Sequence, residues 1–249
     1  MKLTVCMFYD DNLKIYADYS RKINKIYCKK YGYKFIYSSD KKLDNMTPHY
    51  ERYKLLLDNI DDCDWIMWID SDAYFYEDSP PLDYLIYNYH NDKNEYESIL
   101  SYSKLNILSE NYKSYDINNG VFLFKNCENS KKILNRILNS NDIKEVAEKL
   151  HVIYDQAIFR YLYDNNYSNF KDKSCLLKYG ILQHFFDFEL NRFIRNKPYI
   201  HHLAMNNEDK RKKIIKNYYY KKKYFNWTNI LLFTTSCLFS GYFFYKYFR

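Results

Sequence analysis

Two aspartates that could hold a metal ion stand two positions apart, directly after a short apolar segment. The segment Trp65–Ile69 (WIMWI) continues as Asp70-Ser71-Asp72. Side chains alternate along a strand, so Asp70 and Asp72 would project to the same side where the strand ends. Because two close carboxylates repel each other unless a proton or cation lies between them, the pair favours a hard divalent ion, Mg²⁺ or Mn²⁺. The alternative is that Asp72 begins a turn and Asp70 serves as a cap.

Such an ion could bind phosphate groups, which the few, widely spaced glycines of this chain cannot do through a glycine-rich loop. The chain of 249 residues has four glycines, Gly32, Gly120, Gly180 and Gly241, and no two of them are close enough to share a loop. The dinucleotide fingerprint and the P-loop both need clustered glycines, because backbone N–H groups must approach the phosphates. Both motifs are therefore excluded. The six cysteines include no CxxC pair, so their spacing offers no zinc site.

Alternating strand and helix signals surround the two aspartates. Strands are predicted at residues 3–9, 33–37, 65–69, 98–101 and 120–125, and helices at residues 12–31, 48–60, 130–138 and 154–164. This order predicts an α/β sheet with helices on its faces, in which the fully apolar strand 65–69 is central. In the first helix, the predicted buried stripe consists of Ile15, Tyr19, Ile23, Ile26 and Tyr27, and Gly32 is the predicted C-cap.

Positive charge is concentrated towards the C-terminus. The formal net charge is +7, but residues 206–249 contain ten Lys or Arg against two acids, which gives +8 there and leaves −1 for the other 205 residues. Nucleic-acid binding needs a basic face on the folded domain, so a nucleic-acid partner is not expected. A basic segment beside a membrane is favoured instead.

Residues 226–245 form the clearest membrane signal. They read NWTNILLFTTSCLFSGYFFY, twenty residues without a charge, and at 1.5 Å per residue a helix of this length spans ~30 Å, the thickness of a bilayer core. The alternative is an apolar helix packed on the domain. Since the larger basic cluster precedes the span, we expect a single-pass C-terminal anchor with the body in the cytosol, in an ER/Golgi-type or viral membrane.

The segment WIMWIDSDA (residues 65–73) resembles the hydrophobic strand and DxD motif of glycosyltransferases with the GT-A fold. More narrowly, it is similar to the family of fungal α-galactosyl/α-mannosyltransferases and plant xyloglucan xylosyltransferases. Further segments resemble that family's pattern in the same order: YCKKYGY at 27–33, RYK at 52–54, NNGVFLFKN at 118–126, YDQA at 154–157 and YIHHLA at 199–204. The resemblance covers residues 3–205 and implies a Rossmann-like mixed sheet flanked by helices. It departs from the family at Met205, where a glycine is usual, and in the C-terminal position of the predicted anchor.

The resemblance also implies a metal site and a donor site. Asp70 and Asp72 would hold Mn²⁺ (or Mg²⁺) against the diphosphate of a nucleotide sugar, and His202 would complete the metal site. The neighbouring His201 is the alternative ligand, and both histidines could instead be surface residues. Asn118 and Gly120 would line the donor-sugar pocket, although a glycine inside a strand can also mark a bulge.

The remaining candidates would act on the donor or the acceptor. Asp155 and Gln156 would face the reacting centre, where Asp155 orients the sugar or stabilises positive charge at its anomeric carbon. The alternative for Asp155 is a helix N-cap. Lys54 or Arg52 would contact the nucleotide or a phosphate, or be an exposed helix charge. His184 would lie near the acceptor groove, or be a core or surface histidine.

The sequence thus predicts a metal-dependent glycosyltransferase. It would move a hexose or pentose from a UDP- or GDP-sugar to a glycan or glycoprotein acceptor, and the family analogy implies retention of configuration. The alternatives are a catalytically silent membrane-anchored scaffold and a DxD phosphohydrolase, which would need Thr where this chain has Tyr74. The expected organisation is a catalytic domain at 1–205, a basic segment at 206–225, a transmembrane helix at 226–245 and a short tail at 246–249.

Overall fold

Six strands form the central sheet in the order β2-β1-β3-β6-β5-β7. Their bounds are β1 Leu3–Phe8, β2 Lys34–Ser38, β3 Trp65–Ile69, β5 Ser98–Tyr102, β6 Ile117–Lys125 and β7 Ser174–Leu177. Strand β1 pairs in parallel with β2 and β3, whereas β6 runs antiparallel to both of its neighbours, β3 and β5. The predicted strands are present, β3 is central as expected, and the sheet is mixed, as the family resemblance implies.

The coordinates are a computed structural model of the chain. The structure describes residues 1–90, 95–102, 117–145, 149, 155–185, 198–204 and 206–221. The predicted transmembrane segment 226–245, Tyr154 and Met205 lie outside these residues. Among the helices within the described ranges, none combines the length and the apolar character that crossing a bilayer requires.

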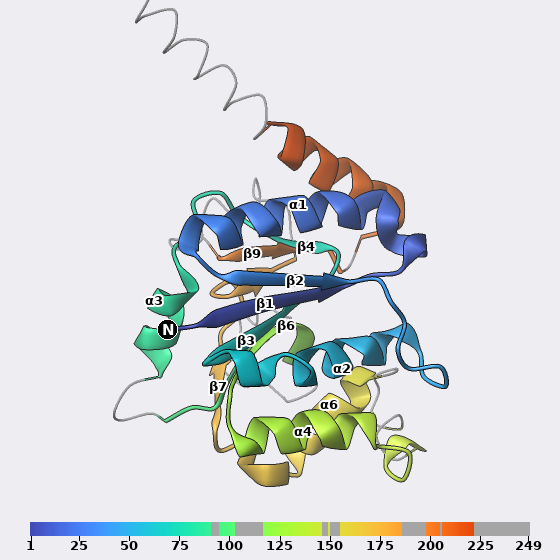
Figure 1. Cartoon of the computed structure of the whole chain (residues 1–249), viewed down its shortest axis with the longest axis vertical. Helices are drawn as coiled ribbons and strands as arrows, with labels where there is room; N and C mark the ends of the chain where they lie inside the picture. The colour runs from blue at the N-terminus through green and yellow to red at the C-terminus, as the bar shows by residue number, and fades with distance from the viewer. Residues whose placement is uncertain are drawn as a thin grey trace, which may run out of the picture.

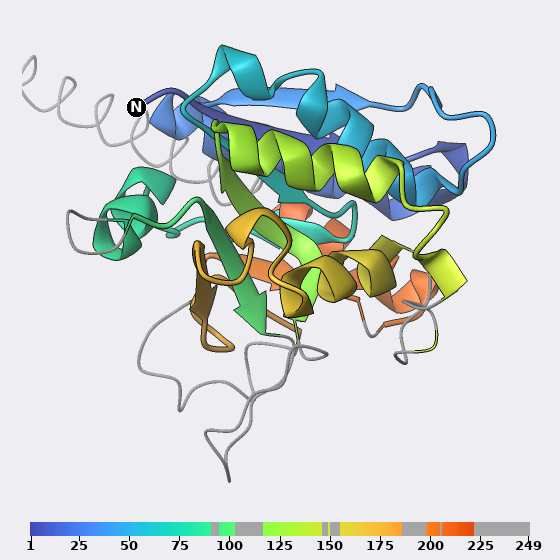
Figure 2. The ribbon, with the colours of Figure 1, turned by 90° about the horizontal axis from the view of Figure 1, so that it is seen from below.

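Helices cover both faces of the sheet (Figure 1). Helix α1 (Lys14–Tyr31) lies on one face, and the opposite face carries α2 (Glu51–Leu57), α4 (Glu128–Leu138) and α6 (Asp155–Asp164), which stand in front in Figure 2. Helix α3 (Leu82–Tyr89) lies near the N-terminus. Single 3-10 turns precede α1 (η1, Asp11–Leu13) and α2 (η2, Pro48–Tyr50), and two more follow at Ile60–Asp62 (η3) and Tyr167–Asn169 (η5).

A second, three-stranded sheet lies beneath α1, with the order β4-β9-β8. Its strands are β4 (Ala73–Phe75), β9 (Ile200–His202) and β8 (Gln183–His184). Strand β4 starts one residue after Asp72 and pairs antiparallel with β9, so that Ala73 is opposite His202. This small sheet therefore carries the end of the DxD segment to the histidines near residue 200.

The buried face of α1 differs from the predicted stripe. Ile23 and Tyr27 are buried as expected, but Ile15 is 46% and Ile26 is 44% exposed. Two polar residues occupy the buried face instead: Ser20 donates to the carbonyl of Ser71, and Asn24 donates to the carbonyl of Ala73 (3.0 Å) while accepting from the N–H of Phe75 (3.0 Å). Because an apolar pattern counts only hydrophobic positions, it missed a face that binds backbone groups of the DxD–β4 segment.

The end of α1 follows the prediction. Gly32 has φ +75°, and its N–H donates to the carbonyl of Cys28. A residue with a side chain rarely adopts this left-handed conformation, which is the usual C-terminal cap of a helix. The cap turns the chain directly into β2.

A further helix spans residues 208–221, within the predicted basic segment. It lies along α1 (Figure 1), where the ring of Tyr219 is 5.6 Å from that of Tyr19. Ile215 is fully buried in the core on the α1 side of the sheet. This helix is therefore packed against the domain through its apolar residues.

Candidate active site

The backbone after β3 forms a fixed turn that presents the two aspartates. The N–H of Asp70 donates to the carbonyl of Gly120 on β6 (2.8 Å), and the N–H of Ala73 donates back to the carbonyl of Asp70 (3.0 Å). Since β6 is antiparallel to β3, it continues alongside the turn beyond the last residue of β3. The strand pairing thus fixes where Asp70 and Asp72 leave the sheet.

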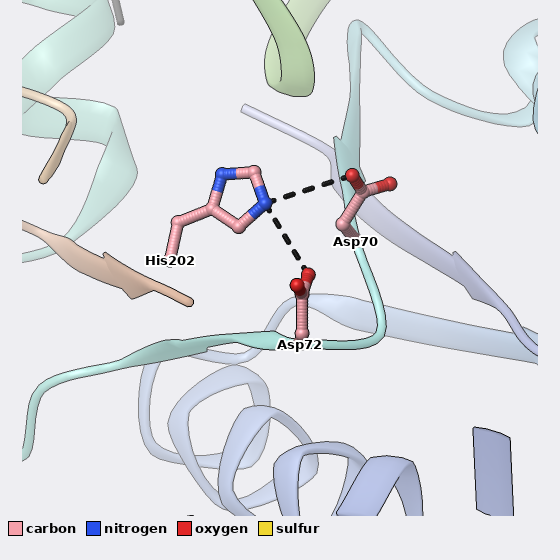
Figure 3. Close-up of side chains that lie close together, drawn as sticks. All are labelled: Asp70, Asp72 and His202. Carbon is pink, nitrogen blue, oxygen red and sulfur yellow. Dashed lines mark ion pairs between the residues drawn. The ribbon is translucent and has the colours of Figure 1, made fainter. Parts of the chain in front are cut away.

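Asp70, Asp72 and His202 converge on one point, as Figure 3 shows. The Nε2 of His202 is 3.2 Å from Asp72 Oδ1 and 3.7 Å from Asp70 Oδ2. One ligand atom from each residue lies within 4.8 Å of the other two, and Asp72 and His202 are buried. Two carboxylate oxygens and one imidazole nitrogen form a donor set that suits a divalent cation.

Each aspartate gives its other oxygen to a protein donor. Asp70 Oδ1 accepts from the indole N–H of Trp68 (2.7 Å) and lies 3.4 Å from an Arg52 nitrogen. Asp72 Oδ2 lies 3.1 Å from Nε of Arg211, which comes from the helix at 208–221. The two carboxylates are therefore held from outside, and their inner oxygens, Asp70 Oδ2 and Asp72 Oδ1, face His202.

A chain of hydrogen bonds orients His202. The N–H of Gly120 donates to Asn118 Oδ1 (2.9 Å), which also accepts from Gln183 Nε2 (3.3 Å). This leaves Gln183 Oε1 as the acceptor for Nδ1 of His202 (2.8 Å). The network therefore assigns the proton to Nδ1 and leaves a lone pair on Nε2, the arrangement found in metal-binding histidines.

His201 points to the opposite side of β9. Its Nδ1 bonds the Tyr74 hydroxyl (2.9 Å), and its ring stacks on that of His184 with 4.7 Å between ring centroids. Burial, together with the neighbouring histidines His184 and His202, lowers the pKa of His201 to about 3. Because strand side chains alternate, His202 alone of the two faces the aspartates, and His184 lies with His201 in the core.

Gly120 touches the candidate metal site directly. A Cβ at this position would lie 2.3 Å from Cε1 of His202, 2.6 Å from Asp70 Oδ2 and 3.0 Å from Asn118 Oδ1. No side chain fits at such distances without displacing one of these groups. The backbone of β6 can therefore approach the cluster only at a glycine.

The pKa values of the two aspartates are shifted in opposite directions. Burial raises the pKa of Asp70, and Asp72 adds to this, against the opposing influence of Arg52 and His202. Burial also raises the pKa of Asp72, but a doubly protonated His202, whose Nε2–H would point at Oδ1 in place of a cation, and the charge of Arg211 outweigh it and leave the pKa below its usual value. A cation among the inner oxygens would favour the ionised form of both.

A second buried cluster is built around Asp155, the first residue of α6. Asp155 Oδ2 accepts from the Tyr53 hydroxyl (2.8 Å) and from Asn119 Nδ2 (2.8 Å), and lies 3.4 Å from Nε of Arg52. Arg52 also donates to the carbonyls of His49 (3.0 Å) and Asn119 (2.8 Å). The structure places Asp155 in a network of hydrogen bonds and ion pairs, in which Arg52 links it to Asp70.

Both clusters line one pocket with a volume of about 530 Å³. The pocket brings together Asp70, Asp72, Asn118, Asp155, Gln156 and His202 from the sequence-predicted set, with Arg52. Its other walls come largely from the end of β1 and the start of α1: Phe8, Tyr9, Asp10, Asn12, Leu13 and Tyr16. Lys54 is not among the lining residues, because its side chain pairs with Asp58 one turn further along α2.

Sequence reasoning missed several residues of the site. Arg211 stood out only as part of a basic run, yet it bonds the carbonyls of Leu203 (3.2 Å) and Ala204 (3.0 Å) besides pairing with Asp72. Gln183 was overlooked, although it directly precedes the candidate His184. Asn119 and Tyr53 are direct neighbours of predicted residues. They lie inside the motifs NNG (118–120) and RYK (52–54), which could have pointed to them.

Comparisons with known proteins identify the chain's relatives. The profile of the galactosyl transferase GMA12/MNN10 family matches residues 7–235, whereas no curated protein matches significantly. A crystal structure of a glycosyltransferase involved in the glycosylation of the major capsid of PBCV-1 superposes with a TM-score of 0.64, at 16% identity over 87% of this chain and 100% of that one. The galactosyltransferase LgtC, in complex with donor and acceptor sugar analogs, gives a TM-score of 0.49 at 16% identity over 86% of this chain and 95% of that one.

The superposition on the capsid glycosyltransferase shows a common fold, and the mixed sheet flanked by helices is that of the expected GT-A fold. The family match covers nearly all of the described residues, including both clusters of the pocket. It favours the glycosyltransferase prediction over the phosphohydrolase alternative. The chain therefore belongs to the galactosyl transferase GMA12/MNN10 family of nucleotide-sugar-dependent glycosyltransferases.

Proposed function

We propose that this chain transfers a hexose or pentose from a UDP- or GDP-sugar to a glycan or glycoprotein acceptor, with a divalent cation, Mn²⁺ or Mg²⁺, bound by Asp70, Asp72 and His202. The convergence of three ligand atoms within 4.8 Å, at the wall of the pocket, carries this proposal. When bound, such an ion neutralises charge on the leaving nucleoside diphosphate. The missing glycine loops agree with it, because the phosphates then need no cradle of backbone N–H groups.

The chain's own residues fix the geometry of the binding site. Gln183 holds the His202 ring through Nδ1, Trp68 and Arg52 hold the outer oxygen of Asp70, and Arg211 holds that of Asp72. Gly120 leaves room for the ion's ligands by adding no side chain. Because these partners are in place beforehand, little reorganisation is needed when the donor binds.

We place the nucleoside of the donor against the end of β1 and the start of α1. Ligands in open α/β sheets bind beyond the carboxyl ends of the parallel strands, and β1 lies beside β3 in the sheet. The aromatic side chains of Phe8 and Tyr16 and the polar side chains of Asp10 and Asn12 line this part of the pocket. They supply flat apolar surface for a base and hydrogen-bonding groups for a ribose.

We assign Asp155 to orienting the donor sugar. Its Oδ2 already has two hydrogen-bond donors and a nearby Arg52 guanidinium, which reduces its strength as a nucleophile. Among the described residues no hydrogen bond reaches Oδ1, so we assign it to accept a sugar hydroxyl, and Gln156 follows it on the pocket wall. Retention of configuration is proposed from the family resemblance, and NMR of the anomeric proton in the first-formed product tests it: an inverted product would contradict it.

A donor-turnover assay tests the proposed function. The full chain is incubated with a panel of UDP- and GDP-sugars, with Mn²⁺ or with EDTA, and release of nucleoside diphosphate is measured. We expect turnover of at least one donor that is lost with EDTA and in both Asp70→Ala and Asp72→Ala. Asp62→Ala, which removes a carboxylate from an exposed pair with Lys34, is the matched control and should retain turnover. Metal-independent turnover in Asp70→Ala and Asp72→Ala would refute the metal assignment.

We further propose that residues 226–245 anchor the enzyme in a membrane with the body on the cytosolic side. The uncharged stretch and the lysines before it support this proposal. Protease treatment of sealed microsomes containing the full chain tests it. We expect the body to be digested from outside, and protection of the body would place it in the lumen.

A further inference from the structure

Helix α1 exposes two isoleucines within a row of lysines. Ile15 and Ile26 are 46% and 44% exposed, and Lys22 and Lys29 are exposed as well. Their spacing, at positions i, i+7, i+11 and i+14, puts Ile15, Lys22, Ile26 and Lys29 on one stripe of the helix. An apolar stripe flanked by lysines on an outer helix face has no role in the core or in the pocket.

The helix at 208–221 extends this surface. It lies along α1, and Nζ of Lys22 is 5.7 Å from the centre of the Tyr219 ring. Its exposed residues include four lysines, Lys210, Lys213, Lys216 and Lys221, beside Glu208, Asp209 and Asn217. We call the surface formed by Ile15, Lys22, Lys25, Ile26 and Lys29 of α1 together with these four lysines the lysine–isoleucine face.

The lysines of this face form no ion pair within the part of the chain that the structure describes, although their two helices also carry the acidic residues Asp18, Glu208 and Asp209. Among the ion pairs between described residues, none involves Lys22, Lys25 or Lys29, or any lysine of the face on the second helix. The acidic residues Asp61 and Glu128 belong to η3 and α4, on the other side of the sheet from α1.

We propose that the lysine–isoleucine face docks on an anionic lipid surface. The lysines contact the acidic headgroups, and Ile15 and Ile26 enter the interface between headgroups and acyl chains. Basic residues near an anionic leaflet each strengthen binding by about fivefold, so several together give firm attachment. This inference goes beyond the proposed catalytic function and does not depend on it.

Two observations favour a lipid surface over an acidic protein or a nucleic acid. First, the isoleucines stand among the lysines, the combination of helices that lie in a membrane interface. A nucleic acid would use the charges and leave the isoleucines exposed. Second, the face includes the last described helix, after which the chain runs through Lys222 and Lys223 to the uncharged residues 226–245. Attachment of that segment would hold the face close to the bilayer.

Docking in this way would also bring part of the pocket wall close to the bilayer. Leu13, just before α1, and Tyr16, in its first turn, line the pocket, and so does Arg211 of the second helix of the face. The two helices that meet the lipid therefore also supply part of the donor site.

Lysine footprinting of the full chain tests the proposal. The protein is reconstituted with vesicles of phosphatidylcholine alone or with about 30% phosphatidylserine, acylated with an N-hydroxysuccinimide ester, and analysed by peptide mass spectrometry. We expect Lys22, Lys25, Lys29, Lys213 and Lys216 to react about three- to tenfold more slowly on anionic vesicles, and about 0.5 M NaCl to reverse this. Lys132, exposed on α4, is the internal control and should react equally in both.

Two double variants, one reversing lysine charges and one removing the isoleucines, test the proposal in the same footprinting experiment. Lys25→Glu with Lys29→Glu, and separately Ile15→Ser with Ile26→Ser, should each abolish most of the protection of Lys213 and Lys216. Lys132→Glu should leave it intact, and circular dichroism should show that all three variants fold, since the changed side chains are exposed. Equal reactivity of the face on both vesicle types, equal protection of Lys132, or protection by polyglutamate but not by vesicles would overturn the proposal.

Discussion

Two groups of buried polar residues share the pocket, and they are built in opposite ways. In the metal-ligand cluster (Asp70, Asp72 and His202), three acceptor atoms face one another around a common point. In the Asp155 cluster (Asp155, Arg52, Tyr53 and Asn119), donors and a guanidinium surround the carboxylate. Both clusters are largely buried, so burial does not explain the difference.

The two clusters differ in whether they need a bound cation or proton to be stable. Facing acceptors in a buried site repel one another until a cation or proton joins them. A carboxylate with hydrogen-bond donors and a paired arginine needs no further ligand to be stable. We therefore expect substitutions in the metal-ligand cluster to affect activity more than stability, and substitutions in the Asp155 cluster to affect both.

The largest effect is expected on activity when a metal ligand is removed. Asp72→Asn replaces one of the two inner oxygens by an amide and weakens the hold on the cation. We expect kcat to fall about a thousandfold, since metal coordination contributes several kcal/mol to stabilising a leaving phosphate. Donor turnover and Mn²⁺ binding followed by electron paramagnetic resonance measure it. Full Mn²⁺ affinity in this variant would contradict the proposed difference between the metal-ligand cluster and the Asp155 cluster.

The next effect is on stability. Asp155→Ala leaves the Arg52 guanidinium buried without one of its carboxylate partners, at a cost of about 3–5 kcal/mol. Urea denaturation should show this loss of unfolding free energy, and the loss in Asp72→Asn should be clearly smaller. If the two variants were equally stable, the Asp155 cluster would not be the scaffold that its contacts indicate.

A smaller effect on activity is expected for Gly120→Ala. The added Cβ would lie 2.3 Å from Cε1 of His202, so the imidazole or the strand must move. We expect donor turnover to fall about a hundredfold, because misplacement of a catalytic group by about 1 Å costs that much. Mn²⁺ affinity should fall with it. Unchanged affinity would show that the backbone yields instead of the ligands.

Arg211→Gln should have a more moderate effect. Glutamine keeps a polar side chain but removes the charge that holds Asp72 Oδ2. Loss of a partner that orients a metal ligand typically weakens metal affinity by about tenfold or more. Arg211→Lys, which retains the charge, should recover part of the Mn²⁺ affinity, and titration calorimetry measures both. No difference between the two variants would mean that the charge of Arg211 does not matter.

The smallest predicted effect has the opposite sign. Asp70 is half-buried beside Asp72, and folding raises its pKa, so the folded state opposes its ionisation at neutral pH. In EDTA, Asp70→Asn should therefore raise the unfolding free energy, by about 1 kcal/mol for each unit by which the native pKa exceeds the unfolded one. Denaturation at pH 7 and at pH values near 3 checks it, because the advantage should vanish once Asp70 is protonated in both states. A loss of stability at pH 7 would contradict the electrostatic description.

The sequence predicted the parts of the fold and site that depend on local patterns. Apolar segments ending in a polar motif gave β3 with Asp70 and Asp72, and Gly32 gave the end of α1. The buried stripe of α1 was wrong at Ile15 and Ile26, because Ser20 and Asn24 bind backbone carbonyls that are about fifty residues away in the chain.

Long-range contacts explain what could not be predicted at the site. Arg211 reaches Asp72 only because its helix packs along α1, and nothing in a run of lysines and arginines indicates which one turns inward. The choice between His201 and His202 depends on the pairing of β9 with β4, which the sequence does not specify. Asp155 was a candidate, but its partners come from α2 and β6.

The packing of the helix at 208–221 has a practical consequence for anyone who shortens this enzyme. A fragment that ended near residue 205, where the basic run begins, would lose the guanidinium beside Asp72 and the fully buried Ile215. It would expose apolar surface on α1 and leave one metal ligand unsupported. A soluble catalytic fragment should therefore extend at least to residue 221, and an inactive shorter fragment would say nothing about the chemistry of the pocket.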